Sequence, residues 1–278
     1  MPEKKLEGFS FETSNGKIVL PDTVIESGDY AAFPFNLTFG NSTLKYATAT
    51  PLCRLNGKDI VLFNKNGSAE FDAVGEGRVI VISKKDAKNA YKILLGAKEH
   101  LVITDGEIYT SGNNTVHEYA GSSVLKIYPK PDALLGFELV GNDGEFALYN
   151  KTDDSTAAVG VSFKKSEETD EYTDYTVRLA YGDEPPYEAY VGIDFAADLA
   201  EIYIDGEKVN DMYYTGVPFE LSLRYHSFPS EITVRLYPLR EDDDVYLEKR
   251  PEYKNGKACD LCAVSIEKVA ICNIELEV

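Results

Sequence analysis

Hydrophobic and polar residues alternate with a period of two along several stretches of the chain. In residues 231–237, Ile232, Val234 and Leu236 fall on one side, and polar or charged residues separate them. This alternation is typical of a β-strand with one buried face and one face in water. Residues 175–181, 221–226 and 274–278 repeat the pattern. Each of these stretches therefore predicts a strand.

Two further stretches, residues 59–63 and 78–82, are almost entirely apolar without alternation, which favours central strands covered on both faces. Asn-Gly or Asp-Gly dipeptides, which suit tight turns with positive φ, recur between the strand patterns. They lie at 15–16, 56–57, 66–67, 105–106, 143–144, 205–206 and 255–256. Short strands separated by such turns predict an all-β fold of antiparallel sandwich or jelly-roll type.

Only one segment of the sequence favours a helix. Ser83 and Asp86 form a start that resembles a capping box, and Gly96 is suited to the position after a helix. Apolar residues fall at helical spacing between them, at Ala87, Ala90, Tyr91 and Leu94. We predict one helix of about three turns near residues 84–95.

The length of 278 residues suits two domains, since domains cluster at about 100 to 150 residues. Pro129 and Pro131 follow a strand-like stretch and interrupt ladder pairing, so we place the boundary near residue 130. The prediction is a β-sandwich domain with the helix over residues 1–130 and a jelly-roll domain over residues 131–278.

Acidic residues outnumber basic residues by 47 to 28, and the formal net charge is −19. Such a chain repels phosphate backbones and anionic lipids, so nucleic acid and membranes are excluded as expected partners. The sequence contains neither the apolar core of a secretion signal nor a run long enough to span a bilayer. We therefore expect a soluble, cytoplasmic protein.

Candidate metal ligands and nucleophiles are present but lack the expected context. Cys259, Cys262 and Cys272 could bind zinc together with Cys53 or a histidine. Residues three apart on a strand point to opposite faces, however, so buried free thiols are favoured. The acidic run at 241–244 could bind Ca²⁺, but a solvated loop is the favoured interpretation. No motif joins the three histidines, His100, His117 and His226, to a nucleophile. We expect neither a metal nor another cofactor.

Residues 198–223 combine a hairpin with a recognisable signature. Asp205-Gly206 is the turn, and Asp211, the pair Tyr213-Tyr214 and then Gly216-Val-Pro-Phe219 follow. This pattern resembles the C-terminal jelly-roll region of family 35 glycoside hydrolases, the β-galactosidase family. Residues 33–37 and 44–52 resemble the segment just after the catalytic barrel of bacterial members. The chain departs from the family at Phe33, Thr50 and Phe219, where Trp, Gln and Trp are usual.

The resemblance implies a non-catalytic accessory region of a β-galactosidase-like enzyme, with a galactose-binding-like domain over residues 131–278. Its partner would be the catalytic barrel, which it would buttress, and galactosides are possible ligands. The paired carboxylates of the active site belong to that barrel, and the family's Asn-Glu motif is absent here, so we expect no catalytic residue in this chain. The alternatives are a stand-alone carbohydrate-binding module and a structural protein-interaction module.

Five residues are the candidates for carbohydrate contact: Asp211, Tyr213, Tyr214, Phe219 and Arg224. The three aromatic residues would offer ring faces, a role that falls to Tyr and Phe because the chain has no Trp. Asp211 and Arg224 would accept and donate hydrogen bonds to hydroxyl groups. The other interpretation, which the sequence favours, places the aromatic rings in the core or on a docking surface.

Overall fold

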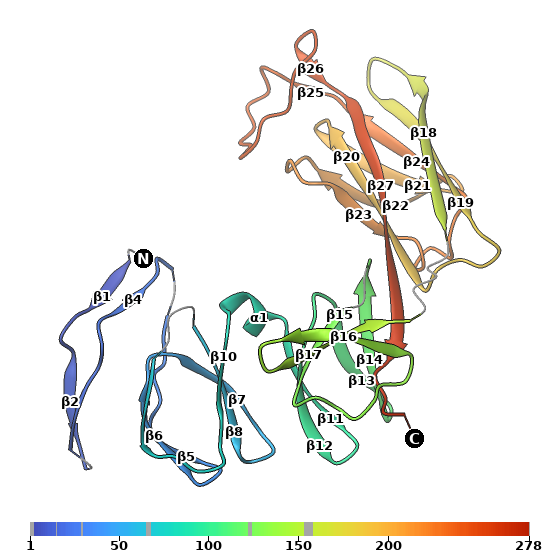
Figure 1. The fold of residues 1–278 in the computed structure, drawn as a ribbon. Helices are drawn as coiled ribbons and strands as arrows, with labels where there is room; N and C mark the ends of the chain where they lie inside the picture. The colour runs from blue at the N-terminus through green and yellow to red at the C-terminus, as the bar shows by residue number, and fades with distance from the viewer. Residues whose placement is uncertain are drawn as a thin grey trace. The chain divides into compact units, whose positions relative to one another are not determined.

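The structure is a computed structural model that describes residues 3–14, 16–28, 30–64, 68–121, 124–152 and 158–277 (Figure 1). Strands account for 61% of the described residues and helix for 2%, so the predicted all-β fold is confirmed. Among the described residues, no helix combines the length and the apolar character needed to cross a membrane.

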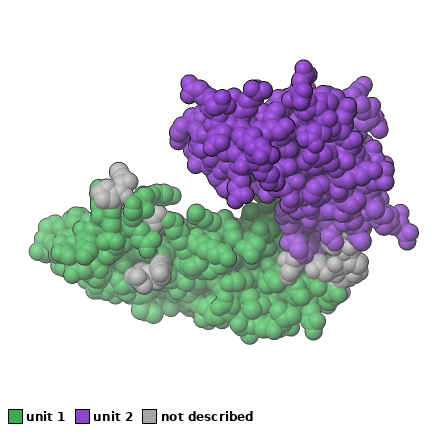
Figure 2. All heavy atoms as spheres, turned by 90° about the horizontal axis from the view of Figure 1, so that it is seen from above, with its two compact units in different colours: residues 1–117, 122–153, 272–278 green, residues 118–121, 154–271 purple. Residues whose placement is uncertain are grey.

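The chain forms two compact units, coloured separately in Figure 2. Unit 1 comprises residues 1–117, 122–153 and 272–278, and unit 2 comprises residues 118–121 and 154–271. The predicted boundary near residue 130 falls inside unit 1. Pro129 and Pro131 follow β15 (Val124–Tyr128) and precede β16 (Phe137–Asp143), which belong to the same sheet. The two prolines follow a strand here and lie within one compact unit.

The first half of unit 1 contains four small sheets. Two are two-stranded: β1 (Lys4–Leu6) pairs with β4 (Thr23–Ile25), and β2 (Ser10–Thr13) pairs with β3 (Gly16–Val19). The third has the order β5 (Phe35–Phe39), β6 (Ser42–Ala47) and β9 (Ala69–Ala73). The fourth has the order β10 (Val79–Ile82), β8 (Asp59–Phe63) and β7 (Thr50–Leu55), and β8 runs parallel to β10.

The strand β8 is covered on both faces, as its unbroken apolar sequence predicted. Ile60 and Leu62 pack into a core with Leu44, while Val61 packs into a different core with Leu101. The other apolar run forms β10, which lies at the edge of its sheet rather than at the centre. The continuous apolar runs therefore predicted both strands correctly. The predicted central position in the sheet holds for β8 but not for β10.

A five-stranded sheet occupies the second half of unit 1. Its order is β11 (Ala90–Leu95), β12 (Lys98–Ile103), β15, β17 (Phe146–Lys151) and β16. Leu101 on one face joins the core of β8, and Val102 on the other face joins a core with Leu134 and Ile274. Two further strands, β13 (Glu107–Ser111) and β14 (Asn114–Ala120), pair with each other, and β14 also pairs with β27 (Asp260–Asn273).

The predicted helix begins where expected but is much shorter. α1 (Lys84–Lys88) is capped by Ser83, whose hydroxyl accepts a hydrogen bond from the Asp86 amide at 3.0 Å. The chain then enters β11, which pairs with β12 along its length. Gly96, with a φ of 60°, lies in the hairpin turn between them instead of ending a helix. The prediction over 84–95 was wrong beyond residue 88 because tertiary strand pairing outweighs a weak local helix preference.

Unit 2 is a two-sheet sandwich around one hydrophobic core. One sheet has the order β18 (Val159–Glu168), β19 (Thr173–Tyr181), β24 (Glu231–Tyr237), β21 (Leu199–Ile204) and β22 (Glu207–Tyr213). The facing strands are β27, β20 (Glu188–Ala196) and β23 (Phe219–Ser222). The short strands β25 (Leu239–Arg240) and β26 (Lys257–Ala258) pair separately. β14 and β27 each supply residues to both units.

Alternation located two of the predicted strands well and two less well. Residues 175–181 lie in β19, and residues 231–237 form β24 with Ile232, Val234 and Leu236 buried. The strand expected over 221–226 ends at Ser222, where a turn begins. At the C-terminal end, Leu276 forms only an isolated bridge with Leu134.

Candidate functional site

The five candidate carbohydrate contacts lie in unit 2 but do not form a single group. Phe219 is only 5% exposed and belongs to the hydrophobic core. Tyr214 packs against the same core, with its ring centre 6.0 Å from that of Phe195 in an edge-to-face arrangement. These two aromatic rings therefore stabilise the sandwich and offer little surface to a ligand.

Arg224 lies in the turn after β23, where its contacts differ from those of the other candidates. Its guanidinium carbon is 4.2 Å from the centre of the Tyr187 ring. Its backbone amide donates a hydrogen bond to the Glu188 carboxylate at 3.2 Å, and the Ser222 hydroxyl donates to the same carboxylate at 2.8 Å. The carboxylate of Glu188 thus holds the turn, and Arg224 is part of that local structure.

Asp211 and Tyr213 lie on the outer face of the five-stranded sheet of unit 2. On β22, Asp211 is directly opposite Glu201 of β21, and Tyr213 is opposite Leu199. Side chains two residues apart on a strand share a face, so both project from the side away from the core. The Tyr213 side chain is the most accessible ring of this face, since the residue is 67% exposed.

Four charged residues are aligned across this face in direct register. Asp174 on β19 is opposite Arg235 on β24, and Arg235 is opposite Glu201. Asp211 completes the row on β22. Directly opposite residues lie about 5 Å apart, which is close enough for their side chains to pair. The row therefore runs acid, base, acid, acid across four neighbouring strands.

Arg235 is held by a carboxylate and two aromatic rings. Its Nε and one terminal nitrogen donate to the two oxygens of Asp174 at 2.8 and 2.9 Å. Its guanidinium carbon lies 3.9 Å from the ring centre of Tyr172 and 5.2 Å from that of Tyr203. The hydrogen bonds that Arg235 donates to Asp174 raise the pKa of Arg235, so the guanidinium stays charged.

Glu201 connects two further tyrosines to the row. Its Oε2 accepts hydrogen bonds from the hydroxyls of Tyr203 at 2.6 Å and Tyr237 at 3.0 Å, and its Oε1 accepts from Lys208 at 3.2 Å. Burial alone would raise the pKa of Glu201, but these hydrogen bonds lower it. The hydrogen bond to Glu201 raises the pKa of Tyr203 to about 12. Lys208 also donates to Asp211 at 2.8 Å.

We call this surface the tyrosine face. It comprises Tyr172, Tyr203, Tyr213, Tyr237, Asp174, Glu201, Lys208, Asp211 and Arg235. Sequence reasoning found only Asp211 and Tyr213 of this group. The alternation in residues 231–237 already placed Arg235 and Tyr237 on a polar strand face. The missing information was the strand register, which brings Glu201 and Asp174 to either side of Arg235.

The cysteines and histidines do not form a metal site in the described part of the chain, where no three His, Cys, Asp or Glu side chains could hold a metal ion. No disulfide joins the four cysteines. Cys272 lies near His117, with 3.9 Å between Sγ and Nδ1, and the Nε2 of His117 is 3.0 Å from the Thr104 hydroxyl. Burial lowers the pKa of His117 to about 4, so the ring is neutral at neutral pH.

In the acidic run at residues 241–244, the Asp243 carboxylate accepts a hydrogen bond from the Arg240 amide at 2.7 Å.

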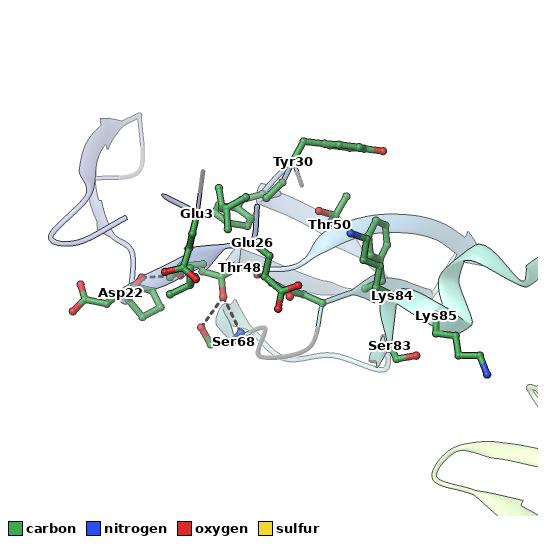
Figure 3. Close-up of a pocket in the computed structure, with 18 residues that line it drawn as sticks. Glu3, Asp22, Glu26, Tyr30, Thr48, Thr50, Ser68, Ser83, Lys84 and Lys85 are labelled. Carbon is green, nitrogen blue, oxygen red and sulfur yellow. Dashed lines mark hydrogen bonds between the residues drawn. The ribbon is translucent and has the colours of Figure 1, made fainter. Parts of the chain in front are cut away.

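A separate pocket of about 730 Å³ lies in unit 1 (Figure 3). Its lining includes Phe33, Thr48 and Thr50. This volume is within the range of small-molecule sites, about 300 to 1,000 Å³. The sequence did not single out this pocket, because its lining comes from segments that are far apart in the chain.

No protein-family model matches the chain, and no curated protein matches it either.

Proposed function

We propose that this chain is a non-catalytic, carbohydrate-binding accessory region of a β-galactosidase-like glycoside hydrolase. The tyrosine face is its contact surface for sugar. The observation that carries the proposal is the sharing of one Glu201 carboxylate by two tyrosine hydroxyls beside the exposed ring of Tyr213. In the proposed enzyme, the partner of this chain is the catalytic barrel, in keeping with the family resemblance.

The composition of the face suits a saccharide. A tyrosine ring combines an apolar surface, which can pack against the C–H groups of a sugar ring, with a polar hydroxyl. Lys208 supplies hydrogen-bond donors, and the Asp211 carboxylate supplies acceptors beside the Tyr213 ring. A sugar offers both kinds of surface, so it can use ring contact and hydrogen bonds at the same time.

The face is organised before any ligand arrives. The hydroxyls of Tyr203 and Tyr237 are held by Glu201, and the Tyr172 ring is packed against Arg235. Side chains that are already ordered lose less conformational entropy when a ligand binds. Tyr213 is the exception, because its ring is mostly exposed and would be ordered by the ligand.

The charges of the face favour a neutral ligand. Asp174, Glu201 and Asp211 supply three negative charges, whereas Arg235 and Lys208 supply two positive charges that are already paired with them. A neutral sugar avoids the repulsion that an anionic sugar meets on a protein of net charge −19. Galactosides without acidic groups therefore fit the proposal.

The carboxylates of the face are unsuited to glycoside hydrolysis. A general acid for this reaction needs a raised pKa, so that it is protonated at neutral pH. The pKa of Glu201 is instead lowered by its three hydrogen bonds, and Asp174 is paired with both donors of Arg235. These carboxylates therefore bind and position neighbouring side chains.

The test is an NMR titration of the full chain with galactose and short β-galactosides. We expect saturable shifts on the tyrosine face with a Kd of about 1 mM, which corresponds to about 4 kcal/mol. Tyr213→Ala should weaken binding, whereas Tyr246→Ala should not, because Tyr246 is 89% exposed in the same unit but lies outside the face. Binding that is absent, or unchanged in Tyr213→Ala, would contradict the proposal.

A second measurement tests the absence of catalysis. The same preparation is incubated at high concentration with an aryl β-galactoside, and release of the chromophore is followed. We expect no turnover above that of buffer. Turnover that a single Asp or Glu substitution in this chain abolishes would contradict the non-catalytic assignment.

A further inference from the structure

The pocket of unit 1 has a floor of connected polar groups. Thr48 is only 1% exposed, and its hydroxyl contacts the Ser68 hydroxyl at 3.1 Å and accepts from the Ser68 amide at 2.9 Å. The side-chain amide of Asn64 donates to the Thr48 carbonyl at 2.9 Å. This floor lies where β6 ends, β7 begins and β8 ends. Its polar groups are therefore positioned by strands rather than by the ligand.

The mouth of the pocket carries an aromatic ring and a hydroxyl group. Tyr30 is 84% exposed, and in Figure 3 it lies above Thr50 and Lys84. The Thr50 hydroxyl accepts a hydrogen bond from the Ala32 amide at 3.2 Å, which leaves its own hydrogen available to donate. An aromatic ring above a polar floor offers apolar contact on one side and hydrogen bonds on the other.

Carboxylates dominate the charge around the pocket. Glu3, Asp22 and Glu26 line it together with Lys84 and Lys85, and in Figure 3 both Asp22 and Lys85 point away from the other labelled residues. An ionised carboxylate accepts hydrogen bonds from hydroxyl groups but repels anions. The lining thus favours a ligand with many hydroxyl donors and no negative charge.

From the buried polar floor, the exposed ring and the excess of carboxylates, we infer that this pocket binds a neutral or amino saccharide of one or two rings. The sugar ring packs against Tyr30, its hydroxyls donate to Glu26, and others reach the hydroxyl groups of Thr50 and Ser68. This site lies wholly in unit 1 and depends on none of the residues of the tyrosine face. The pocket would be a second saccharide site beside the one in the proposed function. The inference does not require the tyrosine face to bind sugar.

The experiment is an amide-resolved NMR titration of the full chain with four separate probes: galactose, glucose, glucosamine and glucuronate. We expect saturable shifts in residues 22–28, 30–33, 48–50, 64 and 83–84, with a Kd of about 1 mM for the three uncharged or cationic sugars. Glucuronate should bind more weakly, because it carries a negative charge toward Glu3 and Glu26. Tyr30→Ala should weaken binding about tenfold. Its matched control is Tyr225→Ala, a residue of unit 2 that is 83% exposed and should have no effect.

This experiment tests saccharide binding at the pocket separately from binding at the tyrosine face. Shifts in the pocket residues that persist in Tyr213→Ala and disappear in Tyr30→Ala support the inference, whatever the tyrosine face does. Shifts confined to the tyrosine face would overturn it and leave the proposed function intact. Pocket binding that is unchanged in both Tyr30→Ala and Glu26→Gln, or glucuronate binding as tightly as glucose, would also overturn it. Both substituted residues are exposed, so the variants should fold like the wild type.

Discussion

The tyrosine face of unit 2 and the pocket of unit 1 are built on different principles. The tyrosine face is built around a row of charges on one sheet, and strand register brings Asp174, Arg235, Glu201 and Asp211 together. The pocket is lined by segments from several strands and loops, and its floor is held by hydrogen bonds between uncharged groups. A flat site can therefore follow directly from regular sheet geometry. A concave site requires several strands and loops from distant parts of the chain to come together.

The largest expected effect is on the charged network. Arg235→Leu leaves the Asp174 carboxylate, whose side chain is only 9% exposed, without its bidentate partner. Removing one member of a largely buried ion pair costs about 2 to 4 kcal/mol of unfolding free energy. Urea unfolding followed by near-ultraviolet circular dichroism measures it. The control is Arg178→Leu on the neighbouring strand, whose pair with Glu231 is 65% and 53% exposed and should contribute under about 0.5 kcal/mol. Equal effects would show that the tyrosine face is not a stabilised network.

A smaller effect is expected at the floor of the pocket. Thr48→Val preserves the shape of the side chain but leaves the Ser68 amide without its acceptor. We expect a loss of about 1 to 2 kcal/mol of unfolding free energy, the cost of one unsatisfied hydrogen-bonding group. Thr38→Val on β5 is the matched control, since Thr38 is exposed and should change stability by less than about 0.5 kcal/mol. A neutral result for Thr48→Val would mean that the floor does not depend on this hydrogen bond.

The smallest expected effect is a loss of unfolding free energy at alkaline pH. It tests a hydrogen bond of the charged network, which the uncharged floor of the pocket lacks. The pKa of Tyr203 is raised to about 12 by its hydrogen bond to Glu201, above the ordinary value of about 10. Its contribution to stability is therefore complete below about pH 10 and is lost as the pH rises toward 12. After allowance for solvent screening, we expect at most about 1 kcal/mol. Urea midpoints measured from pH 9 to pH 12 should fall more steeply in the wild type than in Tyr203→Phe. Identical slopes would refute this role of the hydrogen bond.

Several elements of the fold were predictable from local sequence. The alternation of Ile232, Val234 and Leu236 identified β24 and its buried face, and the apolar run at 59–63 identified β8. The helix was predicted too long because residues 90–95 satisfy both a helical and a strand pattern, and only pairing with β12 distinguishes them. The predicted boundary near residue 130 lies within unit 1. Two prolines mark the end of a strand equally well inside a sheet and between domains.

The candidate site was only partly predictable. Asp211 and Tyr213 were found because they follow a clear hairpin, and a hairpin is a local structure. Tyr214 and Phe219 were chosen from the same signature, but Tyr214 packs against the core where the chain leaves β22, and Phe219 lies in the core at the start of β23. Arg224 was expected on a strand and lies in a turn instead. Exposure of a side chain near the end of a strand depends on where the chain turns, and the local pattern does not contain that information.

Local sequence patterns were enough to predict the all-β class, the faces of the regular strands and the position of the helix cap, because each depends on residues within about a turn or a strand length. Which strands are neighbours, and in what register, depends on contacts between distant segments. Asp174 and Arg235 are 61 residues apart, and Thr48 and Ser68 are 20 apart, yet each pair is joined by hydrogen bonds. Such contacts form when distant segments bury their apolar faces together, so periodicity in one segment cannot specify them.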